Sequence, residues 1–382
     1  MPNTEIADPS AAGGAPAGRT NPAGIESTAD RVRMLIRLIG GHRVADDRET
    51  PHTVVSTGDH RTLRRYGSDA DLAAARSAGR PPILLIPPLA VPARCYDLGP
   101  GQSVVANLLA AGRVPYVVDF GEVTRADRHL GFEDYIDDIV PDAVAQTIAD
   151  AGIGEMVDVV AWSLGGTISL LTVAAHRDLP VRSVTAIGTP LDYAAVAPYP
   201  LITRIMRPVG GLPVTGVLRA LGGIPAPLVR AAYRATAWQR ELRKPAYIVR
   251  NAHDTDALAR MQVIDQFQNS MPGYPGKVAV QMWQNFVYRG EIASGVVDFG
   301  GRRIDLTAIR QPVQLFGSHR DAITSHRAAR HGVDILADSA AVHFTTVETS
   351  HLGLIAGDAA TAETWPRVVD FLGALDAAEP AG

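Results

Sequence analysis

The sequence predicts an α/β fold, a doubly wound and mostly parallel sheet with a helical cap insertion. Three observations predict it. Short, mostly apolar runs alternate with helix-like stretches over residues 83–190, and the same alternation resumes over residues 313–375. Strands without a polar face suit the middle of a parallel sheet, and alternating strands and helices are typical of such sheets. Between the two regions, residues 191–310 are punctuated by proline and glycine and are mostly helix-like.

The expected elements follow from the apolar patterns. Residues 53–56 and 62–66 flank Gly58-Asp59 and predict an edge hairpin. The remaining strands of the sheet are expected at residues 83–86, 116–120, 157–161, 183–187, 313–316 and 342–348. Helices are expected at residues 30–39, 102–111, 132–152, 325–336 and 363–375, and the insertion shows one clear strand, at residues 296–299.

These patterns divide the chain into three parts. Residues 1–27 are rich in Ala, Gly and Pro, and we expect a disordered tail. Residues 28–190 and 311–378 supply the alternating elements and form the predicted core. Residues 191–310 form the predicted cap or lid, which would lie at the carboxyl edge of the sheet, where ligands bind in open α/β folds.

Composition narrows the class of protein. The chain has 382 residues, of which 46% are hydrophobic, and a net charge of −4 without long basic runs, which argues against nucleic-acid binding. The single cysteine, Cys95, rules out an internal disulfide and a zinc cluster built on cysteines. No signal-peptide pattern and no apolar run of about 20 residues is present, so we expect a cytoplasmic protein without a transmembrane segment.

The segment VDVVAWSLGGTISLL, residues 157–171, carries the strongest chemical signal. An apolar strand runs into Ser163, and glycine and an apolar helix follow at once. Strand, sharp turn and helix in this order form the nucleophile elbow of α/β-hydrolases, in which small residues let strand and helix approach closely. Ala161 and Gly165 are the small neighbours here, and Ala161 stands where the motif usually has glycine. The pattern predicts Ser163 as a nucleophile.

A serine hydroxyl needs a base to take its proton and an acid to orient that base. In this fold the chain order is Ser, then Asp or Glu, then His, with the acid and the base just past late strands. Asp321 follows the strand at 313–316 and His351 follows the strand at 342–348, so both fall at the expected places. His319 precedes the acid and Cys95 has no elbow around it, and both are therefore weaker candidates.

Two backbone N–H groups should stabilise the oxyanion of a tetrahedral intermediate. One is that of Leu164, directly after the nucleophile, and the other comes from the loop after the strand at 83–86. Leu89 is the predicted second donor, with Ala90 as the alternative, because Pro87 and Pro88 lack an N–H group. The pattern implies no metal and no organic cofactor.

Long collinear segments over about residues 50–355 resemble the catalytic domain of polyhydroxyalkanoate synthases, most closely the shorter two-subunit type. The matching segments are YDL with GPGQSVVANLLAAG from Tyr96, VVDFG, RADRHLGFEDYIDDIV, GGTISLL, AIGTPLDY and GGRRIDLTAIRQPV. The resemblance implies an α/β-hydrolase core with a cap that acts on acyl groups. The acid and base of that family map onto Asp321 and His351.

The chain departs from that family at three positions. The synthases carry cysteine in the elbow where this chain has Ser163, histidine after the acid where it has Ala322, and tryptophan where it has Phe120. These departures favour a serine-dependent hydrolase or acyltransferase that acts on an ester or an acyl-CoA thioester. Two alternatives stay open, a polyester polymerase that uses serine and a non-catalytic relative that binds a synthase or a granule. A homodimer, or contact of the cap with a polymer or lipid surface, also stays open.

Overall fold

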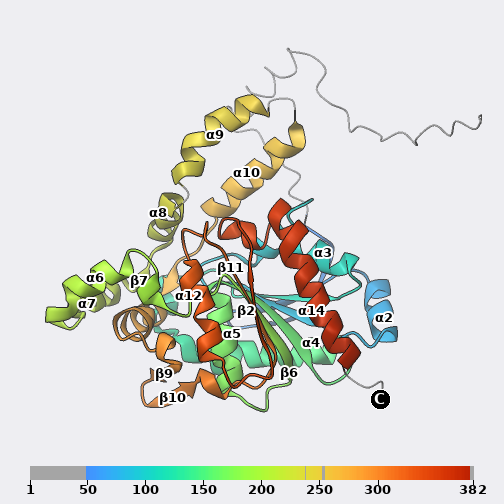
Figure 1. Ribbon diagram of the computed structural model, residues 1–382, viewed down its shortest axis with the longest axis horizontal. Coiled ribbons are helices and arrows are strands. Elements are labelled where there is room, and N and C mark those ends of the chain that lie inside the picture. The colour runs from blue at the N-terminus through green and yellow to red at the C-terminus, as the bar shows by residue number, and fades with distance from the viewer. Residues whose placement is uncertain (1–48, 237, 252–253, 379–382) are drawn as a thin grey trace, which may run out of the picture.

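A computed structural model describes residues 49–236, 238–251 and 254–378 (Figure 1). Eight strands form one sheet in the order β1-β2-β4-β3-β5-β6-β11-β12, with β1 and β2 antiparallel at one edge and the strands from β4 to β12 parallel. The predicted fold class and the predicted edge hairpin are therefore confirmed. The strands are β1 (His52–Gly58), β2 (Arg61–Tyr66), β3 (Ile83–Ile86), β4 (Pro115–Asp119), β5 (Val157–Trp162), β6 (Val181–Ile187), β11 (Val313–Gly317) and β12 (Val342–Thr346).

Helices cover both faces of the sheet, because its central strands are apolar on both faces. In β3, Leu84 and Ile86 enter the core on one face and Ile83 and Leu85 enter the core on the other. The first core is covered by α2 (Asp69–Ser77), α4 (Val140–Ala151) and α5 (Leu164–Ala175). The second is covered by α3 (Val104–Ala110) and α14 (Trp365–Ala378).

Three predicted helices differ in detail from those observed. The helix expected at 132–152 begins as the π-helix η3 (Asp134–Ile139) and ends at Gly152, whose φ of 58° stops α4. The stretch at 325–336 forms two short helices, α12 (His326–Arg330) and α13 (Gly332–Ile335). The last helix is preceded by the π-helix η10 (Ala360–Thr364). The predicted tail at 1–27 and helix at 30–39 lie outside the described residues.

Residues 191–310 hold mostly helices, and a small hairpin closes the segment. In Figure 1, α6 and α7 project to one side of the sheet, and α8, α9 and α10 extend beyond one end of the molecule. The predicted strand at 296–299 is β9, which pairs with an unpredicted strand, β10, in which only Ile304 is buried. No helix among the described residues is both long and apolar enough to cross a membrane. The elements are η4 (Tyr193–Ala195), α6 (Tyr199–Met206), η5 (Arg207–Val209), α7 (Leu212–Leu221), β7 (Gly223–Ile224), α8 (Ala226–Thr236), α9 (Trp238–Arg250), α10 (Thr255–Asn269), β8 (Tyr274–Pro275), α11 (Gly276–Gln281), η6 (Met282–Tyr288), η7 (Ile292–Ser294), β9 (Val296–Phe299), β10 (Arg302–Asp305) and η8 (Leu306–Ala308).

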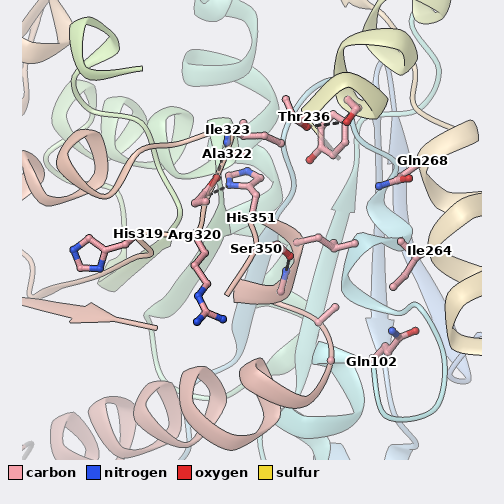
Figure 2. A pocket seen from close by; sticks show the side chains of 16 residues that line it. Gln102, Thr236, Ile264, Gln268, His319, Arg320, Ala322, Ile323, Ser350 and His351 are labelled. Carbon is pink, nitrogen blue, oxygen red and sulfur yellow. Dashed lines mark hydrogen bonds and ion pairs between the residues drawn. The ribbon is translucent and has the colours of Figure 1, made fainter. Parts of the chain in front are cut away.

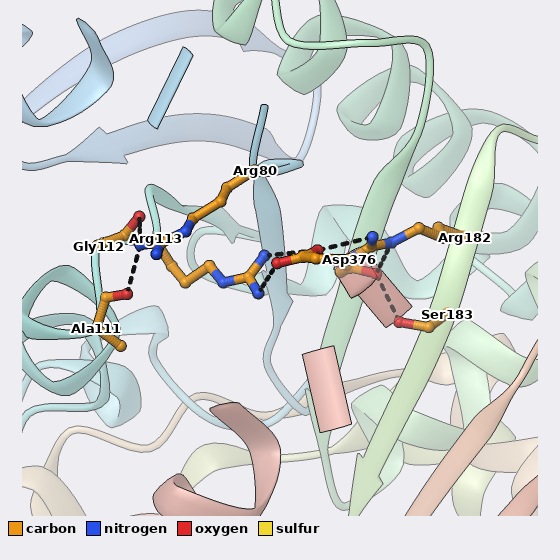
Figure 3. Close-up of polar contacts among 8 residues, drawn as sticks. Arg80, Ala111, Gly112, Arg113, Arg182, Ser183 and Asp376 are labelled. Atoms are coloured by element: carbon orange, nitrogen blue, oxygen red, sulfur yellow. Dashed lines mark hydrogen bonds and ion pairs between the residues drawn. The ribbon is translucent and has the colours of Figure 1, made fainter. Parts of the chain in front are cut away.

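A buried ionic network ties the amino ends of the parallel strands to the last helix (Figure 3). Asp158, at the start of β5, accepts hydrogen bonds from Arg182 at 2.6 and 3.0 Å and from Ser183 at 2.6 Å. Asp376 of α14 accepts from Arg182 at 2.9 Å and also pairs with Arg113. Burial disfavours the charge of Arg182, but the hydrogen bonds to the two carboxylates outweigh it and raise the pKa of the guanidinium.

Candidate active site

Ser163 occupies the sharp turn between β5 and α5. Its φ of 53° and ψ of −126° lie where a residue other than glycine is strained, at a typical cost of about 1–3 kcal/mol. The Ser163 N–H donates to the carbonyl oxygen of Ile187 at 2.8 Å, which ties the turn to β6. A Cβ at Gly165 would come within 2.3 Å of the carbonyl oxygen of Ile86. Glycine is therefore required there, because the start of α5 packs directly on the end of β3.

Asp321 and His351 form a hydrogen-bonded pair. The His351 Nδ1 lies 2.6 Å from the Asp321 Oδ2, and the Asp321 side chain is fully buried. The other carboxylate oxygen accepts from the backbone N–H groups of Ile323 and Thr324, each at 2.8 Å. Because a carboxylate can only accept, the neutral tautomer of His351 that fits this bond carries its proton on Nδ1 and presents Nε2 as an acceptor. The Nε2 is buried and has no hydrogen-bond partner among the described residues.

Ser318 joins the loop that carries the acid to the loop that carries the histidine. Its hydroxyl donates to the carbonyl oxygen of Thr349 at 2.6 Å and accepts from the N–H groups of Thr349 at 3.1 Å and Arg320 at 3.0 Å. Ser318 is fully buried. The loops after β11 and β12 are thus fixed to each other within three residues of Asp321 and two of His351.

Two contacts bring the histidine to the elbow. The ring of Trp162, the residue before Ser163, lies against the His351 ring with centroids 5.0 Å apart and planes inclined at 33°. Gly188 follows Ile187, whose carbonyl oxygen accepts from Ser163, and it lies directly beside the His351 ring. A Cβ atom at this position would be only 3.2 Å from the His351 Cε1. No hydrogen bond joins Ser163 to His351 among the described residues. Hydrogen bonds between a nucleophile and its base are often long without substrate, so the missing bond does not by itself exclude the pair.

Two adjoining cavities flank these groups. A cavity of about 570 Å³ is lined by Asp321 and His351, and Figure 2 shows His351 beside Ala322 and Ile323 with the side chains of His319 and Arg320 turned away from it. A second cavity of about 320 Å³ holds Ser163 and Leu164 among mostly apolar side chains. The residues that line both cavities, and so form the wall between them, are Tyr233, Thr236, Ala322 and Ile323.

The predicted oxyanion donors lie on either side of the contact between β3 and α5. The N–H of Leu164 belongs to the first residue of α5, and such N–H groups have no partner inside the helix. Leu89 is buried in the loop after β3, two residues beyond Pro87, whose backbone lies against Gly165. The helix N-terminus adds a positive potential at Ser163, which favours a developing anion there.

The weaker candidates are engaged elsewhere. His319 bonds to Glu348 at 2.5 Å and stacks on His326 at 3.9 Å between ring centroids. Cys95 is fully buried in η1 (Ala93–Tyr96), and burial raises the pKa of its thiol well above the usual value, which makes it a poor nucleophile. Within residues 49–236, 238–251 and 254–378, no three His, Cys, Asp or Glu side chains are grouped as metal ligands.

Sequence reasoning missed three residues that hold the site. Trp162 packs against the His351 ring, Ser318 joins the two loops by hydrogen bonds, and Gly188 leaves space for the His351 ring. The position of Ser318 in the segment Gly317–Asp321, between strand and acid, was a usable signal, because a hydroxyl there can bond to a neighbouring loop. Nothing in the sequence marks Gly188 or Trp162, because their role depends on a loop that comes more than 150 residues later.

Comparison with known proteins places these features in context. No protein-family model matches the chain. The poly(3-hydroxyalkanoate) polymerase subunit of Haloarcula marismortui is 22% identical over 333 residues, covering 85% of this chain and 67% of the relative. That of Allochromatium vinosum is 24% identical over 324 residues, covering 85% and 88%.

Among solved structures, the esterase RhEst1 from Rhodococcus is 16% identical with a TM-score of 0.48, covering 86% of this chain and all of the esterase. An enol-lactonase from Burkholderia xenovorans is 15% identical with a TM-score of 0.45, covering 85% and 100%. The parallel sheet, the strained elbow and the order Ser, Asp, His define the fold independently of these scores. The chain therefore has the α/β-hydrolase fold and is similar in sequence to poly(3-hydroxyalkanoate) polymerase subunits.

Proposed function

We propose that this protein is a serine-dependent acyl hydrolase or acyltransferase that acts on an ester or an acyl-CoA thioester. The observation that carries the proposal is the His351 imidazole, held by Asp321 at 2.6 Å with its Nε2 buried and unpartnered among the described residues. A buried, unpaired nitrogen is unfavourable in a purely structural role, because it forgoes a hydrogen bond. It suits a base that accepts a proton only during reaction.

The proposed reaction has two halves. The Ser163 Oγ attacks the substrate carbonyl carbon while its proton passes to the His351 Nε2, and the N–H groups of Leu164 and Leu89 receive the oxyanion. The leaving alcohol or thiol takes the proton from Nε2 as the bond to the acyl carbon breaks. Water or an acceptor alcohol then attacks the acyl-serine, and the proton returns through Nε2 to Ser163. Asp321 holds the imidazole in the required tautomer throughout.

The apolar cavity next to Ser163 supports an acyl chain as the group that is recognised. Residues from η4, α6, α8 and β8 line it, all of them within residues 191–310, for which we propose the role of a cap. Each buried methylene group contributes about 0.8 kcal/mol to binding. We therefore expect esters of medium-length acids to be preferred to acetyl esters.

Polymer synthesis is the second candidate, because the relatives named above are polymerase subunits. Serine in the elbow argues against it. An acyl-serine is an ordinary oxyester and is less reactive toward the next hydroxyl group than a cysteine thioester, so release by water should outrun chain growth. A non-catalytic role is disfavoured because it gives no reason for the strained serine and the buried Asp–His pair to occur together.

The test uses the purified full chain. Acyl-CoA thioesters and p-nitrophenyl esters of graded length are offered to the native protein and to Ser163→Ala, and a fluorophosphonate probe reports the reactive serine. We expect labelling at Ser163 only, turnover to free acid or a single transferred product, and a loss of about 10⁴-fold or more in Ser163→Ala. Labelling elsewhere, or an active alanine variant, would refute the nucleophile. High-molecular-weight polyester from 3-hydroxyacyl-CoA would favour the polymerase.

A further inference from the structure

A contiguous stretch of the chain combines exposed apolar side chains with arginine and no acid. Between Asp192 and Glu241 the sequence contains six arginines and no Asp, Glu or Lys, although the whole chain carries a net charge of −4. The structure gathers part of this stretch on α6, η5 and α7, which project from the body (Figure 1). We call its exposed side chains the apolar–arginine surface: Leu201, Arg204, Ile205, Arg207, Val209, Leu212, Val217, Arg219 and Leu221.

These helices are apolar on two sides. Ile202, Met206 and Leu218 face inward and pack against the core. On the outside, Leu201 is 62% exposed and Leu212 is 68% exposed. A helix in contact with water normally presents a polar outer face, and large exposed apolar patches mark sites of interaction. The exposed apolar side chains on the outer face of α6 and α7 therefore suit contact with a partner that has an apolar interior.

The charge on this surface identifies the partner. Arg204, Arg207 and Arg219 are exposed and have no described ion pair with an acid. A second copy of the chain is disfavoured, because a two-fold contact through this face would bring the same arginines together. In an interfacial helix, apolar side chains such as leucine enter the acyl layer, and arginines lie beside them at the level of the anionic headgroups.

The surface also continues into the apolar cavity. Pro198 and Tyr199, at the start of α6, line the cavity that holds Ser163. Leu228 of α8 lines the same cavity and is 53% exposed to solvent. A molecule that lies in a lipid layer against the apolar–arginine surface would thus have an apolar route to this cavity.

We propose that the apolar–arginine surface binds the surface of an anionic phospholipid layer, with α6 and α7 lying in its interface. This goes beyond the proposed function, since it is independent of the chemistry at Ser163. The measurement is cosedimentation of the full-length protein with vesicles of phosphatidylcholine alone and of phosphatidylcholine mixed with phosphatidylglycerol, at low and high salt. We expect binding to the mixed vesicles only, weakened by salt because headgroup attraction is screened.

Two sets of substitutions separate charge from apolar contact. The triple variant Arg204→Gln, Arg207→Gln, Arg219→Gln should bind about a hundredfold more weakly, at about fivefold per arginine. The triple variant Leu201→Ser, Leu212→Ser, Val217→Ser should also lose binding, because the insertion is removed. The matched control changes three exposed arginines elsewhere, Arg177→Gln, Arg303→Gln and Arg327→Gln, and should bind like the native protein.

Several results would overturn the proposal. They are an absence of vesicle binding, equal binding to both kinds of vesicle, and unchanged binding of the first triple variant. Equal weakening in the control would show attraction by net charge rather than by this surface. The surface would instead bind a second copy of the chain if light scattering showed a dimer, if the triple serine variant were monomeric, and if no vesicle binding were seen. Ser163→Ala should bind vesicles normally, so a failure of the proposed chemistry would leave this test intact.

Discussion

The two ends of the parallel sheet both bury a carboxylate, and they use it differently. At the amino ends, Asp158 meets Arg182 and Ser183, and the network extends to Asp376. At the carboxyl ends, Asp321 is equally enclosed, but its partner His351 leaves Nε2 unpaired among the described residues. The first end pairs its charges within the protein, which stabilises the fold. The second leaves one buried nitrogen unpartnered, and we assign the chemistry to that end.

Exchanging each carboxylate for its amide should separate the two ends most clearly. We expect Asp321→Asn to lower kcat/KM by about 10⁴-fold, because an amide no longer fixes the reactive tautomer of His351. Its melting temperature should change little, since the loop keeps its backbone hydrogen bonds. Initial rates on a p-nitrophenyl ester, with thermal melts in parallel, measure both effects.

Asp158→Asn should show the opposite pattern. The buried Arg182 would lose its closest carboxylate, and breaking a buried ion pair typically costs about 3 kcal/mol or more. We expect a lower midpoint in urea but a nearly native kcat/KM at temperatures where the variant is folded. An Asp158→Asn protein that is folded yet as inactive as Asp321→Asn would show that the two ends are not separate.

Two serines allow a finer comparison along the same pair of strands. Ser318 joins the loops after β11 and β12, and Ser339 joins the segments before them. The Ser339 hydroxyl donates its one proton between the carbonyl oxygens of Gln311 at 2.6 Å and Ala341 at 3.0 Å. Replacing either serine by alanine should cost about 1–3 kcal/mol in the free energy of unfolding. Only Ser318→Ala should also lower kcat/KM, by about tenfold, because it loosens Asp321 against His351. If Ser318→Ala and Ser339→Ala lowered kcat/KM equally, the positioning role of Ser318 would be refuted.

The smallest expected effect concerns Cys95. Its burial raises the pKa of the thiol, so the group stays protonated at neutral pH and becomes a thiolate only at higher pH than usual. We expect no reaction of the folded protein with a disulfide reagent at pH 8, rapid reaction after unfolding in guanidinium, and native activity in Cys95→Ala. Rapid labelling of the folded protein with loss of activity would bring the thiol back as a candidate nucleophile.

The sequence by itself determined the sheet and the order of the candidate groups. The wholly apolar run at residues 83–86 and the mostly apolar run at residues 157–161 are best buried between two helical layers, which is why they predicted central parallel strands. Asp321 follows β11 and His351 follows β12, and these neighbouring parallel strands end at one edge of the sheet. The contact between Asp321 and His351 could therefore be predicted from the sequence alone.

Tertiary structure decided what no local pattern encodes. The contact of Trp162 with His351 and the hydrogen bond from the Ser318 hydroxyl to Thr349 both join segments that are distant in the chain. The sequence of residues 198–223 is rich in apolar side chains, but it does not show which of them face the core. Periodicity reports that a face is apolar, whereas only packing decides whether another part of the chain covers it.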